Sequence, residues 1–188
     1  MGALLLDSIN QPRDLKQLNE QQVKQLCAEI RQFLLENISK TGGHLASNLG
    51  VVELTVALHR VLDTPQDKIV FDVSHQVYPH KMITGRKAGF TDPLGNPEIS
   101  GYTNPAESAH DHFVVGHTST SVSLATGVAK ARDLKGEKYN VIALIGDGSL
   151  TGGEAFEGLN NAAVLGSNFI VIVNDNDKIG RASCRERV

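Results

Sequence analysis

The sequence has little of what several classes of protein require. It contains only two cysteines, Cys27 and Cys184, among 188 residues, so it does not indicate a disulfide framework. No apolar run approaches the roughly 18 residues that a membrane-spanning helix needs. The apolar stretch "ALLL" near the N-terminus is too short for the core of a signal peptide. We therefore expect a cytoplasmic protein with no membrane partner.

The chain also lacks a strong charge of either sign. Its formal net charge is -3 and 21% of its residues are charged, with no basic stripe, no interleaved aromatic residues and no zinc-finger spacing. These absences argue against a nucleic-acid partner. The hydrophobic fraction of 40% is ordinary for a soluble protein, and the length suffices for one domain with a core.

The C-terminal stretch "NDNDKIGRASCRERV" has two unlike halves. Residues 179–188 have no periodicity. They can be encoded by a nucleotide sequence that resembles a widely used short-read sequencing adapter. Lys178 would then take only its first base from the gene. We expect a truncated N-terminal domain at 1–177 and adapter read-through, rather than a natural domain, at 178–188. A basic arm and a frayed end are the alternatives.

Two segments near the N-terminus have apolar residues at helical spacing. The first predicts an amphipathic helix at 20–38, because Asn19 and Gln22 resemble a capping box and Gly42-Gly43 can end the element. The second segment, "GVVELTVALHRVLD", predicts a helix at 50–62.

The middle of the chain contains three segments with different residue patterns. A short apolar run predicts a buried strand at 68–73. Residues 86–113 are rich in Gly, Pro, Asn, Asp and Ser, which indicates a long loop of the kind that is usually functional or disordered. Helical spacing returns at 118–134, with Gly136 as the stop.

The C-terminal third carries the clearest architecture. Apolar strands at 140–145 and 168–173 flank a helix at 152–165, which is the pattern of a βαβ unit. Continuous apolar strands are typical of a parallel sheet that is covered on both faces. The predicted fold class is therefore α/β, with a parallel sheet and helices on both faces.

Polar residues follow both of these strands. The right-handed crossover rule places the two strand ends at one edge of the sheet, where ligands bind. Asp147 is therefore expected near Asn174, Asp175 and Asn176. Carboxylate and amide oxygens are ligands that Mg²⁺ prefers, with phosphate oxygens or water completing its shell.

Glycines flank Asp147 in "GDGSLTGGE". We expect Gly146 and Gly148 to allow a tight turn and the close approach of a ligand, while a helix that begins near Gly152 directs its free N–H groups at an anion. Together with the polar strand ends, these features predict a metal–diphosphate site.

Each motif alone is weak, since a lone GDG or Asn-Asp is more often only a turn. A dinucleotide site fits worse, because the third glycine comes one place too late for G-x-G-x-x-G. A P-loop is excluded because no Gly-Lys-Ser/Thr follows. The combination of GDG, 25 residues and Asn-Asp-Asn resembles the signature of thiamine diphosphate enzymes.

Further segments narrow this resemblance. "GGHLASNLGVVELTVALHRVLD", "DVSHQVYPHK", "GHTSTS" and "VIALIGDGSLTGGEAFEGLNNAA" closely resemble the N-terminal domain of the 1-deoxy-D-xylulose-5-phosphate synthases, a family of the transketolase superfamily. The resemblance covers about residues 4–177. It implies the thiamine diphosphate-binding domain of transketolase type.

The resemblance also implies roles for single residues. Asp147 and Asn176 bind magnesium, and Asn176 also contacts the diphosphate. The other cofactor contacts come from two short segments and one histidine, namely Gly116, His117, Thr118, Gly148, Ser149 and His75.

Two histidines are implied to be catalytic. His75 in "DVSHQ" approaches the cofactor and the reacting carbon, and His44 in "GGHLAS" faces the substrate. A side chain that titrates near neutrality can move protons and donate hydrogen bonds. His80 and Lys81 in "YPHK" are interpreted as supporting residues. The remaining histidines are interpreted as surface or satisfied core residues, namely His59, His110 and His112.

The resemblance implies that the full-length bacterial enzyme is a homodimer that condenses pyruvate with D-glyceraldehyde 3-phosphate. A second domain of the family carries the glutamate that activates the cofactor, so we expect the present chain alone to be inactive. Two alternatives stay open. One is another transketolase-like thiamine diphosphate enzyme, and the other is a non-enzymatic phosphate-binding α/β module.

Overall fold

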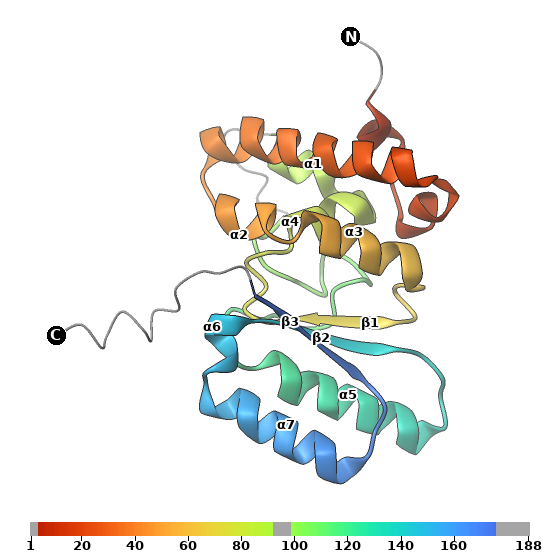
Figure 1. The fold of residues 1–188 in the computed structure, drawn as a ribbon, viewed down its shortest axis with the longest axis vertical. Helices are drawn as coiled ribbons and strands as arrows, with labels where there is room; N and C mark the ends of the chain where they lie inside the picture. The colour runs from red at the N-terminus through yellow and green to blue at the C-terminus, as the bar shows by residue number, and fades with distance from the viewer. Residues whose placement is uncertain (1–3, 92–98, 176–188) are drawn as a thin grey trace, which may run out of the picture.

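The computed structural model describes residues 4–91 and 99–175, in which three parallel strands lie between two layers of helices (Figure 1). The strands are β1 (Lys68–Phe71), β2 (Val141–Gly146) and β3 (Ile170–Asn174), in the order β1-β2-β3. Both pairings are parallel. The α/β class and the parallel sheet predicted from the sequence are confirmed. The expected domain boundary at 177 lies outside the described residues.

One face of the sheet is covered by α5 (Ser121–Lys135) and α7 (Gly153–Leu165), which pack side by side below the strands in Figure 1. Alternate residues of β2 point to this face and form a cluster with small residues of α5. Burial of each large aliphatic side chain contributes about 1.5–3 kcal/mol. The buried members of this cluster are Val70, Val122, Ala125, Ala129, Val141, Ala143, Ile145 and Ala155.

The opposite face is covered by the N-terminal half of the chain. The helices of this layer are α1 (Glu20–Thr41), α2 (Leu45–Leu49), α3 (Val52–Val61) and α4 (Tyr78–Lys81). The other residues of β2, Ile142 and Leu144, point to this face. The sheet therefore has helices on both faces, as the sequence predicts.

A second core lies within this layer, between α1 and the segments that precede and follow it. Short 3-10 helices at Leu5–Ser8 and Pro12–Gln17 and two further turns, Met82–Arg86 and Lys87–Phe90, enclose it. Its fully buried members are Leu6, Leu15, Leu26, Ile30, Leu34, Val52, Val56, Met82 and Ile83.

The ends of α1 follow the local rules used for the prediction. Asn19 accepts a hydrogen bond from the Gln22 N–H over 2.9 Å, and the Gln22 side chain accepts one from the Asn19 N–H over 2.9 Å. The predicted capping box is confirmed. Gly42, with φ of 81°, ends the helix three residues later than expected.

The predicted helices at 50–62, 118–134 and 152–165 are found as α3, α5 and α7, and the three predicted strands as β1, β2 and β3. The short helices α2, α4 and α6 (Asp147–Leu150) were not predicted. They are one turn or little more, and such segments carry too few residues for a periodic pattern.

Strand β3 departs from the expectation that both apolar strands are covered on both faces. Ile170 and Val173 are 51% and 44% exposed, whereas all of β2 up to Ile145 is buried. The reason is that β3 pairs only with β2 within the described residues and lies at the edge of this sheet. Among the helices described here, none has the length and hydropathy that a membrane span requires.

Candidate functional site

The three strands end at one edge of the sheet, as the crossover rule predicts. Gly146, the last residue of β2, lies opposite Asn174, the last residue of β3. Asp147 and Asp175 therefore follow directly from two adjacent strand ends. Asn176, the second expected magnesium ligand, lies outside the described residues.

The backbone after β2 differs from the expected tight turn. Asp147 begins a single turn of helix, α6, and Gly146 has an ordinary extended conformation with φ of -79° and ψ of 152°. Neither Gly146 nor Gly148 has a positive φ. Among residues 4–91 and 99–175, apart from each glycine's chain neighbours and the backbone of its own helix, no atom lies within 4 Å of where a Cβ on either residue would be. These glycines leave open space beside Asp147, which is what the close approach of a ligand needs.

The glycine that the fold requires here is Gly152, the N-cap of α7. A Cβ at Gly152 would lie 1.9 Å from Oγ of Ser119. The Ser119 hydroxyl donates a hydrogen bond to the carbonyl of Ser149 over 2.6 Å. The segment that contains Gly116, His117 and Thr118 is thereby held against the segment that contains Gly148 and Ser149.

Asp72, directly after β1, holds the same segment from the other side. Its carboxylate accepts hydrogen bonds from the N–H groups of Ser119 and Ser121, over 3.0 and 2.9 Å. Asp72 is 1% exposed. Because this carboxylate accepts from two N–H groups at the N-terminus of α5, those two groups are not available to a diphosphate.

The backbone before His75 adopts an uncommon conformation. Val73 and Ser74 have positive φ values of 57° and 64°, which are costly for residues with a Cβ and especially for a β-branched one. Ser74 is held there because its hydroxyl donates to the carbonyl of Val115 over 2.8 Å and accepts from the N–H of Thr103 over 3.1 Å. This bend carries His75 away from the line of β1.

His44 and His75 lie together. Their ring centroids are 5.2 Å apart at an interplanar angle of 74°, and the Tyr102 ring lies 5.9 Å from that of His44. The N–H of His44 donates to the Tyr78 hydroxyl over 3.3 Å. The two residues expected to be catalytic therefore form one edge-to-face pair, although they come from α2 and from the end of β1.

Gly116, His117 and Thr118 are exposed. Their hydrogen bonds within the described residues are local, with His117 Nδ1 2.9 Å from the carbonyl oxygen of Thr118. The segment joins the rest of the site through its neighbours Val115 and Ser119. The hydrogen bonds of Ser74, Asp72 and Ser119 hold three segments together at one edge of the domain. These segments contain His75, His117 and Ser149.

Lys81 and Arg86 form a buried ionic cluster with two carboxylates from the long loop. Lys81 Nζ lies 2.6 Å from Oε2 of Glu107, and Arg86 binds both oxygens of Asp111 over 2.7 and 2.8 Å. Burial alone would raise the pKa of Asp111, but the hydrogen bonds from Arg86 and His80 hold it well below its usual range. This cluster anchors the loop through Lys81 and Arg86, and the expected supporting role of Lys81 in the site stays a prediction.

Four histidines lie beside this cluster, and three of them form a chain with Thr64. His80 Nε2 is 2.9 Å from Oδ1 of Asp111, and His80 Nδ1 is 2.8 Å from His59 Nε2. Thr64 Oγ1 lies 3.2 Å from His59 Nδ1 and 3.1 Å from His110 Nδ1. Burial lowers the pKa of His59 and His80 and lowers that of His110, and of His112 nearby, to about 4. The interpretation of His59 as a satisfied core residue is confirmed.

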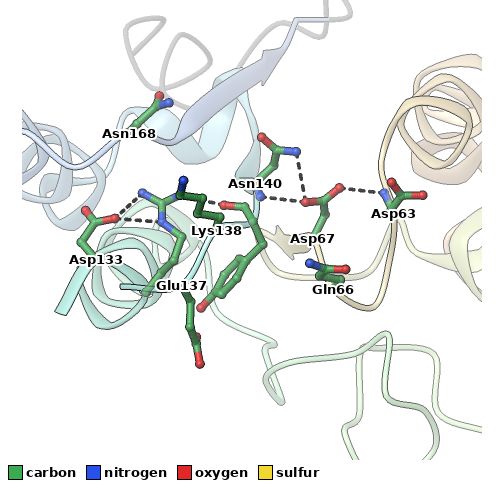
Figure 2. Close-up of a pocket in the computed structure, with 10 residues that line it drawn as sticks. Asp63, Gln66, Asp67, Asp133, Glu137, Lys138, Asn140 and Asn168 are labelled. Atoms are coloured by element: carbon green, nitrogen blue, oxygen red, sulfur yellow. Dashed lines mark hydrogen bonds and ion pairs between the residues drawn. The ribbon is translucent and has the colours of Figure 1, made fainter. Parts of the chain in front are cut away.

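A polar pocket at the amino ends of the strands is not part of this site (Figure 2). Its central carboxylate, Asp67, accepts hydrogen bonds from the backbone and side chain of Asn140, over 2.7 and 3.0 Å, and from the N–H of Asp63 over 2.7 Å. Asp67 thus joins the starts of β1 and β2, and its oxygens are already satisfied.

The donors at the carboxyl edge suit a magnesium–diphosphate group. Within 4–91 and 99–175, His, Cys, Asp and Glu side chains do not gather in threes as a protein-only metal cage requires. Magnesium does not need such a cage, because one or two carboxylates or amides, phosphate oxygens and water complete its shell. Asp147, with open space at Gly146 and Gly148 beside it, fits that pattern.

Sequence reasoning missed several residues that build this edge. Asp72 follows β1 just as Asp147 follows β2, so the same rule of polar strand ends applied to the first strand would have found it. Asn48, whose side chain donates to the carbonyl of His75, and Ser119, whose hydroxyl donates to that of Ser149, have no comparable signal in the sequence. These partners lie 27 and 30 positions away along the chain.

The fold and this edge define a parallel α/β domain of the diphosphate-binding type found in transketolase-like proteins. A family model described as 1-deoxy-D-xylulose-5-phosphate synthase matches residues 6–183. The chain therefore belongs to the 1-deoxy-D-xylulose-5-phosphate synthase family, which is thiamine diphosphate-dependent.

Individual relatives agree with this assignment. The 1-deoxy-D-xylulose-5-phosphate synthase of Dictyoglomus thermophilum is 56% identical over 174 residues, which cover 93% of this chain and 28% of the relative. That of Caldanaerobacter subterraneus is 58% identical over 173 residues, with 92% and 28% covered. The probable chloroplastic synthase 2 of Oryza sativa is 51% identical over 175 residues, with 93% and 24% covered. The chain thus spans about a quarter of the length of these relatives.

Proposed function

We propose that the chain is the N-terminal part of an enzyme that condenses pyruvate with D-glyceraldehyde 3-phosphate. The products are carbon dioxide and 1-deoxy-D-xylulose 5-phosphate, a precursor for isoprenoid and thiamine synthesis. The proposal is supported by the family match and by relatives of that name with 51–58% identity. The full-length protein is proposed to be a cytoplasmic homodimer.

The cofactor is proposed to bind at the carboxyl edge of the sheet. Asp147 and Asn176 would hold Mg²⁺, and the diphosphate contacts would come from Gly148, Ser149 and Asn176. The segment Gly116, His117 and Thr118 would complete the cofactor contacts. The observation that carries this proposal is the register that pairs Gly146 with Asn174, because it places two polar strand ends side by side.

Bound thiamine diphosphate supplies a carbon nucleophile and an electron sink, while the protein supplies binding, orientation and proton transfer. His75 and His44 are proposed to serve the last of these roles, with His75 near the cofactor and His44 facing the substrate. An imidazole at hydrogen-bonding distance of a reacting oxygen can accept a proton when it is neutral and donate one when it is protonated. The contact between the two rings lets them act on one substrate.

Binding of thiamine diphosphate to the 188-residue chain, measured by calorimetric titration with and without Mg²⁺, tests the site. We expect weak binding that requires the metal and is lost in Asp147→Ala. The matched control is Glu137→Ala, which removes an exposed carboxylate at the opposite edge of the sheet. Magnesium-dependent binding that Asp147→Ala leaves unchanged would instead favour a phosphate-binding module in which GDG is only a turn.

The reaction itself is tested with the full-length gene product. Pyruvate with D-glyceraldehyde 3-phosphate is expected to give product, whereas ketose phosphates as donors are not. The opposite preference would indicate another transketolase-like enzyme. The 188-residue chain alone is expected to show no turnover, and measurable synthase activity from it would refute its proposed incompleteness.

A further inference from the structure

Asn48 lies beneath the His44–His75 pair and contacts both of its members. The side chain of Asn48 is 0% exposed. Its amide nitrogen, Nδ2, donates to the carbonyl oxygen of His44 over 2.8 Å and to that of His75 over 2.9 Å. Its oxygen, Oδ1, accepts a hydrogen bond from the N–H of Tyr78 over 2.8 Å.

This arrangement uses both amide hydrogens of Asn48 and one lone pair of its oxygen. The three partners belong to different segments, since His44 is the N-cap of α2, His75 follows the bend after β1, and Tyr78 begins α4. A single buried side chain therefore joins the three backbones around the histidine pair.

We infer that Asn48 is the positioning residue that fixes His44 against His75. The inference rests on the proposed function, in which these two histidines act on one substrate. Without the amide, the His75 carbonyl loses its donor and the Tyr78 N–H loses its acceptor in a buried place, while the His44 carbonyl keeps only the backbone N–H of Asn48 at 3.2 Å. A buried polar group without a partner is costly. Relaxation towards water or another donor would separate the two backbones and with them the two rings.

The chemistry at this position is specific to an amide. Aspartate keeps an acceptor for the Tyr78 N–H but places a carboxylate oxygen against both histidine carbonyls, so two attractive contacts become repulsive. Leucine keeps the approximate volume but satisfies none of the three partners. Of the common substitutions, none reproduces two donors and one acceptor in this geometry.

The direct test is nuclear magnetic resonance of the 188-residue chain with ¹⁵N-labelled histidine, without cofactor. We expect a nuclear Overhauser cross-peak between the His44 and His75 rings. In Asn48→Asp this cross-peak should be lost and the ring signals of both residues should shift. The signals of His59 and His117 should stay in place, because Asn48 contacts neither of them.

A matched control separates positioning from general stability. Asn37, in α1, donates its side-chain amide to the Phe33 carbonyl over 2.8 Å and has no contact with the histidine pair. Asn37→Asp should lower the unfolding midpoint while it retains the cross-peak. If Asn48 contributes to stability alone, Asn48→Asp will keep the cross-peak just as Asn37→Asp does. That result would overturn the inference.

A second variant covers the case in which Asn48→Asp does not fold. Asn48→Ser is small enough to admit water and can still donate to one of the two carbonyls. It is expected to weaken the cross-peak and to shift at least one of the two ring signals. An unchanged cross-peak with unchanged ring signals in this variant would contradict the inference.

Addition of thiamine diphosphate and Mg²⁺ to the unsubstituted chain distinguishes this inference from the proposed function. If the cofactor shifts neither ring signal while Asn48→Asp still removes the cross-peak, the proposed function fails and the positioning by Asn48 stands. If the cofactor shifts both signals and Asn48→Asp leaves the pair intact, the site stands and the inference fails. In the full-length enzyme, we expect Asn48→Asp to lower kcat more than it raises KM.

Discussion

His80 donates a hydrogen bond from Nε2 to Oδ1 of Asp111 over 2.9 Å, with both side chains almost completely buried. Since the carboxylate cannot donate, this contact fixes the tautomer of a neutral His80, whose Nδ1 must then accept from His59. The same reasoning makes Thr64 the donor to His59 and His110 the donor to Thr64. In the series His110, Thr64, His59 and His80, each group donates its hydrogen bond in the direction of Asp111.

This arrangement predicts that the protein loses stability as the pH falls below about 6.5. The pKa values of His59, His80, His110 and His112 are lowered from 6.5, in the last two to about 4. The unfolded chain therefore takes up protons first. The stabilisation is complete above pH 6.5 and is lost as the pH falls from there towards about 4.

Urea unfolding at a series of pH values between about 7.5 and 4.5 measures this effect. Each histidine contributes at most about 1.4 kcal/mol per pH unit to the slope, and His110 and His112 contribute less because they are partly exposed. His110→Phe is expected to make the slope shallower. A free energy of unfolding that is flat between pH 6.5 and 5 would contradict the lowered pKa values of these histidines and the neutral state on which the tautomers rest.

Asp111→Asn is expected to destabilise the domain by about 3 kcal/mol or more, because it leaves the buried Arg86 guanidinium without its bidentate partner. The matched control is Glu53→Gln, which makes the same chemical change opposite Arg31 in a pair whose side chains are 39% and 59% exposed. That control should cost no more than about 1 kcal/mol. Equal losses in urea unfolding would show that burial of the Asp111 cluster has no special effect.

The sequence predicts the parts of this fold that repeat locally. The continuous apolar run of β2, the helical spacing in α7 and the capping box at Asn19 each lie within one short segment, so all three could be predicted without tertiary information. The rule that parallel strands end at one edge then predicts that the ends of β2 and β3 are neighbours, and the pairing of Gly146 with Asn174 confirms this.

The rest depends on contacts between distant residues. Asn48 bonds to His75 across 27 positions, and Asp72 bonds to Ser119 across 47. No periodicity or spacing encodes such pairs, because each is set by how the helical layers pack on the sheet. For the same reason the sequence suggested a tight turn at Gly146, whereas the residue that must lack a side chain is Gly152, opposite Ser119.

Gly152→Ala is expected to destabilise the domain by about 1–3 kcal/mol, since its Cβ would overlap the Ser119 side chain. Ser119→Gly in the same chain should restore most of the loss, because it removes the clash and also relieves a positive φ of 72°. The thermal midpoints of the four chains form a double-mutant cycle. Gly127→Ala is the control, since nothing lies within 4 Å of its Cβ, and should stabilise α5 by about 0.5–1 kcal/mol. Additive effects at 119 and 152 would exclude the clash.

Asp72→Ala is expected to reduce both stability and cofactor binding. Loss of its carboxylate removes the acceptor for two N–H groups at the start of α5, which costs about 2 kcal/mol. It also releases the segment that contains His117 from the end of β1. Magnesium-dependent binding of thiamine diphosphate should therefore weaken by more than the loss of folded protein accounts for.

Asp14→Ala provides the control that separates these two effects of Asp72. The Asp14 carboxylate also accepts two backbone hydrogen bonds, from Asn10 and Gln11 over 3.0 and 3.1 Å, but it belongs to the N-terminal layer. Its loss should lower the unfolding midpoint and leave the affinity of the folded protein for the cofactor unchanged. If Asp72→Ala behaves in the same way, the Asp72 carboxylate does not hold the cofactor segment, and Gly116, His117 and Thr118 must be positioned by the Ser74–Val115 and Ser119–Ser149 contacts.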